Sequence, residues 1–148
     1  MDTEILRPVS PADFERAADL IRSGALVAFP TETVYGLGAN GLDAAACARI
    51  YEAKGRPSDN PLILHVSDLE MAETLTPAMP PLAAHLLTAF APGPITVILP
   101  KAAYIPDIVT GGLSTVGVRC PDHDVARRLI RAAGVPIAAP SANTSGRP

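Results

Sequence analysis

Hydrophobic residues occur along this chain in two patterns, at helical spacing and in short unbroken runs. Ser10 and Pro11 open the first helical stretch, because serine can cap free backbone amides and proline suits the first helical turn. Asp13 complements the helix dipole, and the apolar positions after it share one face. These positions are Phe14, Ala17, Ala18 and Ile21. The pattern predicts an amphipathic helix that ends near Gly24.

Short apolar runs between turn residues predict the strands. Residues 25–29 form a continuous apolar run that Pro30 ends, which is typical of a strand covered on both faces. Further strands are predicted at 62–66, 95–99, 115–119 and 137–139. Helices are predicted at 43–54, 69–75 and 81–90, and from Asp122 or Asp124 to Gly134.

The interleaving of helices and strands predicts an α/β fold. The chain has 148 residues, of which 48% are hydrophobic, so it can bury the core of one domain. Its 16 prolines gather at the borders of the predicted elements, and no repeat or low-complexity tract interrupts them. We therefore expect a single domain over residues 1–148.

Charge and composition narrow the functional classes. The net charge of -3 argues against a strongly basic nucleic-acid binder, and 4% aromatic residues supply few stacking platforms for RNA. The N-terminal segment MDTEILRPVS does not resemble a secretory signal, and no apolar run reaches the length of a membrane span. Cys47 and Cys120 lack metal-ligand spacing and are expected to be buried thiols. These features predict a cytoplasmic protein without a membrane association.

Lys54 and Arg56 are candidate anion ligands. On a continuous helix they would point in nearly opposite directions, but Gly55 and Pro57 break the helix here. The two cations can then converge on one phosphate group, the arginine as a planar fork and the lysine as a mobile charge. The alternative is a solvated helix end whose cations complement the dipole, and spacing alone does not decide between the two.

Two further motifs combine hydroxyl and amide groups. Ser141 and Asn143 in APSANTSG follow an apolar strand and can bind phosphate or ribose, although turn formation explains the same residues. Thr31 and Thr33 alternate with Glu32 in PTETVYGLG, whose glycines permit close approach to a ligand. This motif lacks the ending of a P-loop and is weak support for a binding loop.

Two residues at predicted strand ends complete the candidates. His65 is a polar ring in the apolar run PLILHV and needs a partner, either a core neighbour or a ligand. Arg119 ends TVGVR and can hold a carboxylate with both arms of its fork if an anion lies nearby. Each residue also has a purely structural interpretation, as a satisfied histidine and a solvent-exposed arginine.

The chain carries five segments in a fixed order: PTETVYGLG, IYEAKGRPSDNPLILHV, FAPGPITVILPK, TVGVRCPDH and APSANTSG. Together they resemble the YrdC-like family of threonylcarbamoyl-AMP synthases along nearly the whole chain. The resemblance implies a twisted mixed sheet flanked by helices around a concave substrate cavity. It also implies that L-threonine, bicarbonate and ATP give threonylcarbamoyl-adenylate and pyrophosphate. A separate transferase complex would use this product to modify tRNA.

The resemblance also implies roles for individual residues. The expected ATP-binding residues are Lys54, Arg56, Asn60, Thr115, Ser141 and Asn143, with Lys54 and Arg56 also acting in catalysis. The expected threonine-binding residues are Thr33, His65 and Arg119. Mg²⁺ would arrive with the nucleotide phosphates, so no metal ligand is expected from the protein.

Two other functions remain as alternatives. One is a module of the same fold that binds RNA or a ribosomal intermediate without catalysis, and the other is a domain of a carbamoyltransferase. Members of the family normally continue into a segment with a Gly-x-Glu-Ser-Thr-like motif. We therefore expect that a C-terminal segment follows Pro148 in the native protein.

Overall fold

The computed structural model describes residues 3–6, 10–55, 57 and 60–140. Within them, six strands form one mixed sheet in the order β1-β2-β6-β3-β5-β4. The strands are β1 (Val27–Phe29), β2 (Gly36–Asn40), β3 (Ile63–His65), β4 (Val97–Pro100), β5 (Thr115–Arg119) and β6 (Ile137–Ala139). Neighbouring strands are antiparallel except β3 and β5, which run parallel. The predicted α/β class with a mixed sheet is confirmed.

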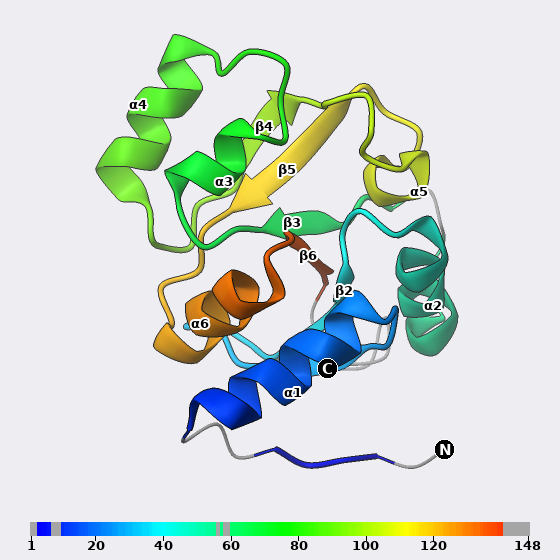
Figure 1. Cartoon of the computed structure of the whole chain (residues 1–148). Coiled ribbons are helices and arrows are strands. Elements are labelled where there is room, and N and C mark those ends of the chain that lie inside the picture. The colour runs from blue at the N-terminus through cyan, green and yellow to red at the C-terminus, as the bar shows by residue number, and fades with distance from the viewer. Residues whose placement is uncertain (1–2, 7–9, 56, 58–59, 141–148) are drawn as a thin grey trace.

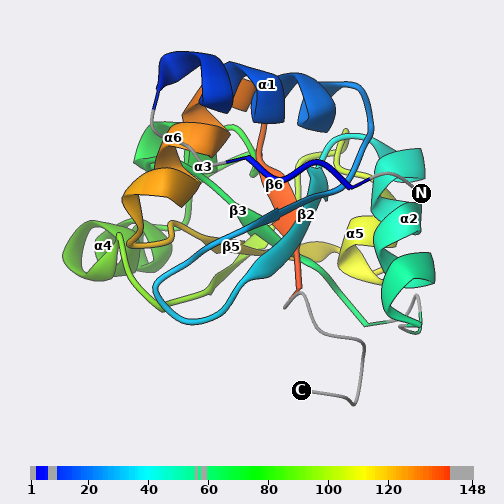
Figure 2. The same ribbon diagram turned by 90° about the horizontal axis from the view of Figure 1, so that it is seen from below.

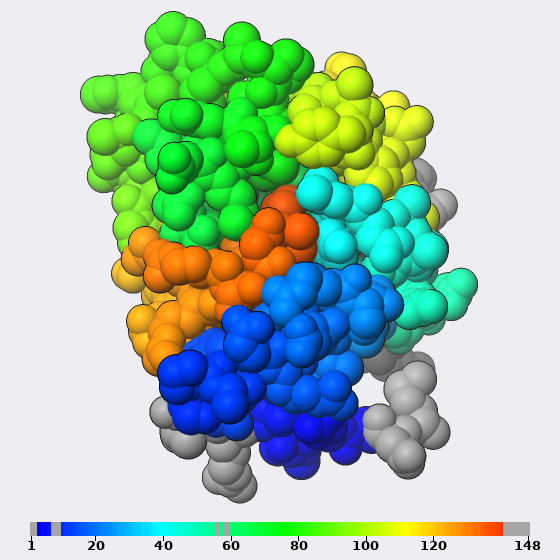
Figure 3. Space-filling view, viewed as in Figure 1, coloured from blue at the N-terminus to red at the C-terminus, as the bar shows by residue number. Residues whose placement is uncertain are grey.

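The helices are α1 (Pro11–Arg22), α2 (Ala44–Lys54), α3 (Leu69–Glu73), α4 (Pro81–Phe90), α5 (Asp107–Thr110) and α6 (Asp124–Ala133). Helices α1 and α6 lie side by side in both ribbon views, while α2 and α5 gather at another corner of the molecule (Figures 1 and 2). In the space-filling view, segments of α1, α3, α4 and α6 cover one side of this face, and α2 and α5 cover the other (Figure 3).

The helix boundaries follow the local signals in the sequence. The Asp13 carboxylate accepts hydrogen bonds from the backbone N–H and the hydroxyl of Ser10, which fixes the start of α1. Asp43 caps α2 by accepting a bond of 3.1 Å from the Ala46 N–H. Helix α2 ends where Gly55 takes a left-handed conformation with φ of 62°. The predicted helix at 43–54 is therefore confirmed.

Strand β6 separates two hydrophobic clusters. Ile137 and Ala139 belong to the cluster formed with α1 and α6, and Ala138 belongs to the cluster formed with α2, α3, α4 and α5. The alternation follows from the pleat, since successive side chains of a strand point to opposite faces. Every residue of β6 is buried, so this strand and its neighbour β3 form the most enclosed part of the sheet.

The prediction that the first strand is covered on both faces is wrong. Within the described part of the chain β1 pairs with β2 alone, and Ala28 is exposed between half-buried Val27 and buried Phe29. The continuous apolar run 25–29 predicted burial of both faces, but an edge strand of an antiparallel pair needs apolar contacts on one face only. Its alanine is small enough to face solvent at little cost.

Two elements are absent from the sequence prediction. Strand β2 occupies most of the stretch YGLGANG, although glycine is unusual in strands. A Cβ at Gly38 would lie 2.7 Å from both the Phe29 ring and Ile137, so close packing requires glycine at this position. Helix α5 was missed because it is a single turn of 4 residues, too short for a periodic pattern.

Candidate functional site

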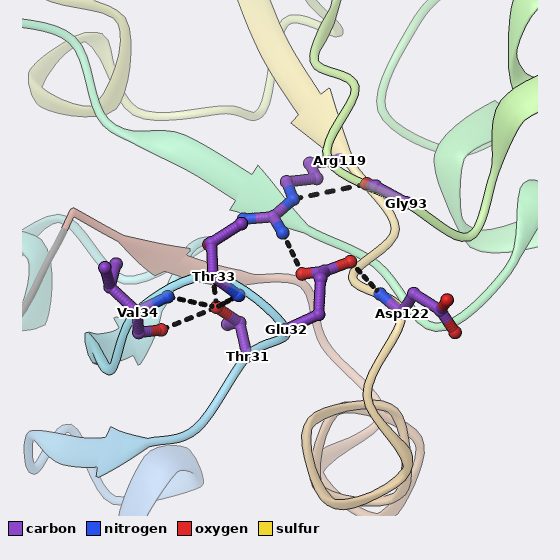
Figure 4. Close-up of polar contacts among 7 residues, drawn as sticks. All are labelled: Thr31, Glu32, Thr33, Val34, Gly93, Arg119 and Asp122. Carbon is purple, nitrogen blue, oxygen red and sulfur yellow. Dashed lines mark hydrogen bonds and ion pairs between the residues drawn. The ribbon is translucent and has the colours of Figure 1, made fainter.

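Arg119 and Glu32 form the polar centre of the candidate site (Figure 4). An Arg119 Nη2–H donates to Glu32 Oε1, and the two side chains are only 12% and 21% exposed. Glu32 Oε2 accepts a bond of 2.6 Å from the Asp122 backbone N–H, and Arg119 Nε donates to the Gly93 carbonyl at 3.3 Å. Glu32 therefore joins the loop between β1 and β2 to the end of β5 and to the residues before α6.

The loop between β1 and β2 is ordered by Thr31. Its hydroxyl donates to the Val34 carbonyl at 2.5 Å and accepts from the backbone N–H groups of Thr33 and Val34 at 3.3 and 3.2 Å. The hydroxyls of Thr31 and Thr33 lie 3.1 Å apart. Thr33, a predicted threonine ligand, follows Glu32 in sequence. The hydrogen bond that Arg119 donates to Glu32 therefore also holds Thr33 near the centre of the site (Figure 4).

His65 lies beside Arg119 on the neighbouring parallel strand, because β3 and β5 pair in the register His65 to Arg119. The histidine is 5% exposed, and its ring meets Phe29 edge to face with centroids 5.9 Å apart. Its Nδ1 lies 3.2 Å from the Ile63 carbonyl and 3.3 Å from the Ile137 carbonyl. Both partners are acceptors, so Nδ1 carries the proton and Nε2 is left as an acceptor.

Burial, together with the positive charge of Arg119, lowers the pKa of His65 to about 4. The two backbone carbonyls and Glu32 oppose this shift, but they do not offset the loss of hydration. At neutral pH the imidazole is therefore uncharged. It can accept a hydrogen bond from a hydroxyl group beside a guanidinium that can hold a carboxylate.

The described ATP-binding candidates lie toward the opposite end of β3 and β5. Ile63, three residues after Asn60, pairs with Gly117, two residues after Thr115. Tyr51 connects α2 to the segment before β3 and to α5, since its hydroxyl lies 2.7 Å from the Asn60 carbonyl oxygen and 2.8 Å from that of Ile108. Thr115 and Arg119 are four strand residues apart, which corresponds to about 13 Å.

Lys54 is the last residue of α2 and is only 2% exposed. Burial of an ammonium group is costly unless it is paired, so a solvated helix end does not describe this residue. This observation removes the alternative that the sequence left open for Lys54. Arg56, Ser141 and Asn143 lie outside the described residues, and their predicted roles stay predictions.

Glu32 is the residue that the sequence interpretation missed. In the sequence Glu32 only separates Thr31 from Thr33. In the structure its carboxylate connects the loop between β1 and β2, the end of β5 and the residues before α6. A signal was present, because Glu32 is the sole charged residue between Arg22 and Asp43. A lone charge within an apolar and glycine-rich stretch needs a partner, and Arg119 supplies it.

Other features of the described residues contribute no substrate ligand. Cys47 and Cys120 are buried free thiols, as expected, and burial raises the pKa of Cys47 to about 12. The described residues contain no group of three His, Cys, Asp or Glu side chains that could hold a metal ion. No described helix combines the length and the apolar character needed to cross a membrane.

A groove of about 1180 Å³ lies against α1 and β1. Its walls include Glu4, Phe14, Phe29, Tyr35 and Leu129. Among the described residues, none of the predicted substrate ligands lines it. The concave substrate cavity implied by the resemblance stays a prediction.

Comparison with known proteins gives consistent matches. The Sua5/YciO/YrdC family model, described as "Telomere recombination", matches residues 19–148. The threonylcarbamoyl-AMP synthase of Pyrococcus abyssi is 58% identical over 132 residues, which are 89% of this chain and 39% of that protein. The threonylcarbamoyl-AMP synthase of Bacillus subtilis is 56% identical over 134 residues, covering 90% of this chain and 39% of that protein.

Solved structures agree. P. abyssi Sua5 complexed with L-threonine has a TM-score of 0.95 and 52% identity, covering 99% of this chain and 44% of that one. E. coli YciO has a TM-score of 0.79 and 27% identity, covering 90% of this chain and 65% of that one. This chain thus spans about two fifths of the length of its two synthase relatives. By sequence and by fold, it belongs to the Sua5/YciO/YrdC family.

Proposed function

We propose that this chain provides the ATP- and threonine-binding part of a threonylcarbamoyl-AMP synthase. The substrates are L-threonine, bicarbonate and ATP, and the products are threonylcarbamoyl-adenylate and pyrophosphate. The observation that carries the proposal is the pairing of His65 with Arg119 beside the Thr33 loop. These are the three predicted threonine ligands, in a chain that closely matches a Sua5 structure complexed with L-threonine.

The described side chains suit the polar groups of threonine. The Arg119 guanidinium would hold the α-carboxylate, since arginine is matched to planar anions. Neutral His65 would accept a hydrogen bond from the threonine hydroxyl through Nε2, because Nδ1 already serves two carbonyls. The Thr33 hydroxyl would add a hydrogen bond to one of these two groups. The amino group is thereby left for reaction with bicarbonate.

ATP would occupy the other end of the β3–β5 pair. Lys54 would bind the phosphates, and because it is buried its attraction to their negative charge is stronger than in water. Asn60 and Thr115 would supply neutral hydrogen-bonding groups. Strand β6 also ends here, because Ala139 pairs with Ile63, and Ser141 and Asn143 follow it in sequence. Arg56 follows Lys54 after one glycine. Strand order and sequence thus support a common site for the six predicted ATP ligands.

The chemistry proceeds in two steps. The threonine amine forms a C–N bond with the carbon of bicarbonate, and water leaves, giving a carbamate. A carbamate oxygen then attacks the α-phosphorus of ATP while the bond to the β-phosphate oxygen breaks and pyrophosphate leaves. The protein would contribute proximity and stabilisation of negative charge by Lys54 and Arg56. Mg²⁺ bound to the phosphates would neutralise further charge, and we assign it no protein ligand.

The proposal includes the cellular setting of the reaction. A separate transferase complex would consume the adenylate to modify tRNA, and we expect both reactions in the cytoplasm. Direct RNA binding by this chain is not required, and the net charge of -3 gives it little basis.

The test is incubation of the protein with L-threonine, labelled bicarbonate and ATP, with pyrophosphate and the labelled adenylate measured together. Both products should form only when all three substrates are present. Lys54→Ala should abolish or strongly reduce both, while Arg131→Ala at the exposed end of α6 should not. Pyrophosphate release that does not depend on threonine would contradict the proposal.

A further inference from the structure

Glu32 has a hydrogen-bond pattern that fits a defined role beside Arg119. Its two carboxylate oxygens accept from two different segments, Oε1 from Arg119 Nη2 and Oε2 from the Asp122 backbone N–H. The second bond anchors the carboxylate to the main chain, where side-chain motion is small. Glu32 is therefore a fixed acceptor for the guanidinium and not a mobile surface acid.

Arg119 is held by two of its three nitrogen atoms. Nε donates to the Gly93 carbonyl and Nη2 donates to Glu32, whereas no described residue accepts a hydrogen bond from Nη1. A guanidinium has five N–H donors, so Nη1 and the second hydrogen of Nη2 can still bind an anion. The two protein contacts determine the direction in which this remaining edge points.

We propose that Glu32 is a positioning residue for the amino-acid substrate, which holds Arg119 so that its Nη1 edge receives the substrate carboxylate. This inference rests on the proposed function. Fixing a long side chain before binding removes part of the entropy cost of ordering it, which increases affinity without a direct contact. Glu32 also balances the charge of a guanidinium that is 12% exposed, so Arg119 can stay in place when substrate is absent.

An isosteric change tests the role. Both partners of Glu32 are N–H donors, whereas a glutamine amide has one acceptor oxygen and one donor group. Glu32→Gln must therefore lose one of the two bonds at nearly constant volume. We expect threonine to bind about tenfold more weakly, the size of effect typical of a lost bond to a charged group. Glu32→Asp keeps both acceptors and should recover part of the affinity.

Two controls separate positioning from a general structural effect. Glu4→Gln breaks the exposed ion pair of Glu4 with Arg16 and should leave the threonine affinity unchanged. In an Arg119→Lys background, which lacks the fork, Glu32→Gln should cost little further affinity. Equal losses in both backgrounds would show that Glu32 does not act through Arg119 and would overturn the inference.

The measurement is calorimetric titration with L-threonine, together with exchange rates of the Asp122 backbone amide by NMR. If the wild-type protein binds threonine and Glu32→Gln binds it equally well or more tightly, the inference fails and the proposed function stands. If the wild-type protein does not bind threonine, the proposed function fails, and with it the substrate role of Glu32. In either case, fast exchange of the Asp122 amide in the wild-type protein would show that its hydrogen bond to Glu32 is not stable, and the inference would fail.

Discussion

His65 and Arg119 face each other as register partners on the parallel strands β3 and β5, one buried and uncharged, the other a cation. The cation helps to keep the imidazole neutral, because a positive neighbour disfavours a second positive charge. The site can thus offer a neutral acceptor and a charged donor to one small ligand. This division of roles suits an amino acid that carries a hydroxyl and a carboxylate.

The low pKa of His65 predicts a loss of stability in mild acid. Below pH of about 6.5 the unfolded chain binds a proton that the native chain does not bind until about pH 4, so unfolding becomes more favourable as the pH falls through this range. Above this range both states are neutral and the stability is fully present. The shift corresponds to up to about 3 kcal/mol.

Denaturant unfolding of the wild-type protein and of His65→Gln between pH 8 and 4 measures this effect. The stability advantage of the wild-type protein over the variant should shrink as the pH falls. Because both proteins contain the same carboxylates, the comparison cancels the effect on stability of those that titrate near pH 4. A difference that stays constant with pH would mean that His65 has the same pKa in the native and the unfolded state.

The charges beside His65 predict opposite shifts in two variants. Arg119→Met removes a cation and should raise the pKa of His65, whereas Glu32→Gln removes an anion and should lower it. The Arg119 shift should be the larger, because the contribution of Glu32 is the smallest of those acting on the ring. NMR titration of the His65 ring resonances measures both. Shifts of the same sign would show that the two groups do not act through their charges.

The neutral acceptor on His65 predicts discrimination by the hydroxyl group. L-Valine has nearly the shape of L-threonine but leaves a buried acceptor without a donor, so it should bind about 10- to 100-fold more weakly. L-Serine keeps the hydroxyl and should lose only the contribution of one methyl group. Competition against labelled L-threonine measures the order. Equal binding of valine and threonine would show that His65 Nε2 does not accept a hydrogen bond from the substrate.

The glycine in β2 predicts a packing requirement behind the site. Gly38→Ala places a methyl group 2.7 Å from Phe29, whose ring contacts His65, and should destabilise the protein by about 1–3 kcal/mol. Gly117→Ala is the matched control, since its nearest contact, at 3.1 Å, is the methyl group of Thr96, which precedes the outer strand β4. Thermal unfolding compares the two. Equal effects would indicate a backbone cause and not contact with the ring.

Local signals determined most of the elements of this fold. The α1 start at Ser10, the α2 cap at Asp43, and the bounds of α4, β5 and β6 depend on residues close in sequence, so they could be predicted. The five motifs likewise identified the family, because they are contiguous segments in a fixed order. Strand β2 could not be predicted, because its glycines are explained by Phe29 and Ile137, which approach from other segments.

The sequence by itself determined which residue types are available to the site, including a fork-shaped cation at Arg119 and a polar ring at His65. Only the tertiary structure decided that these two are strand neighbours and that Arg119 is already held by Glu32. The reason is physical: Glu32 and Arg119 are 87 residues apart, and their pairing depends on sheet order and burial. Propensity and spacing act over a few residues and carry no information on such contacts.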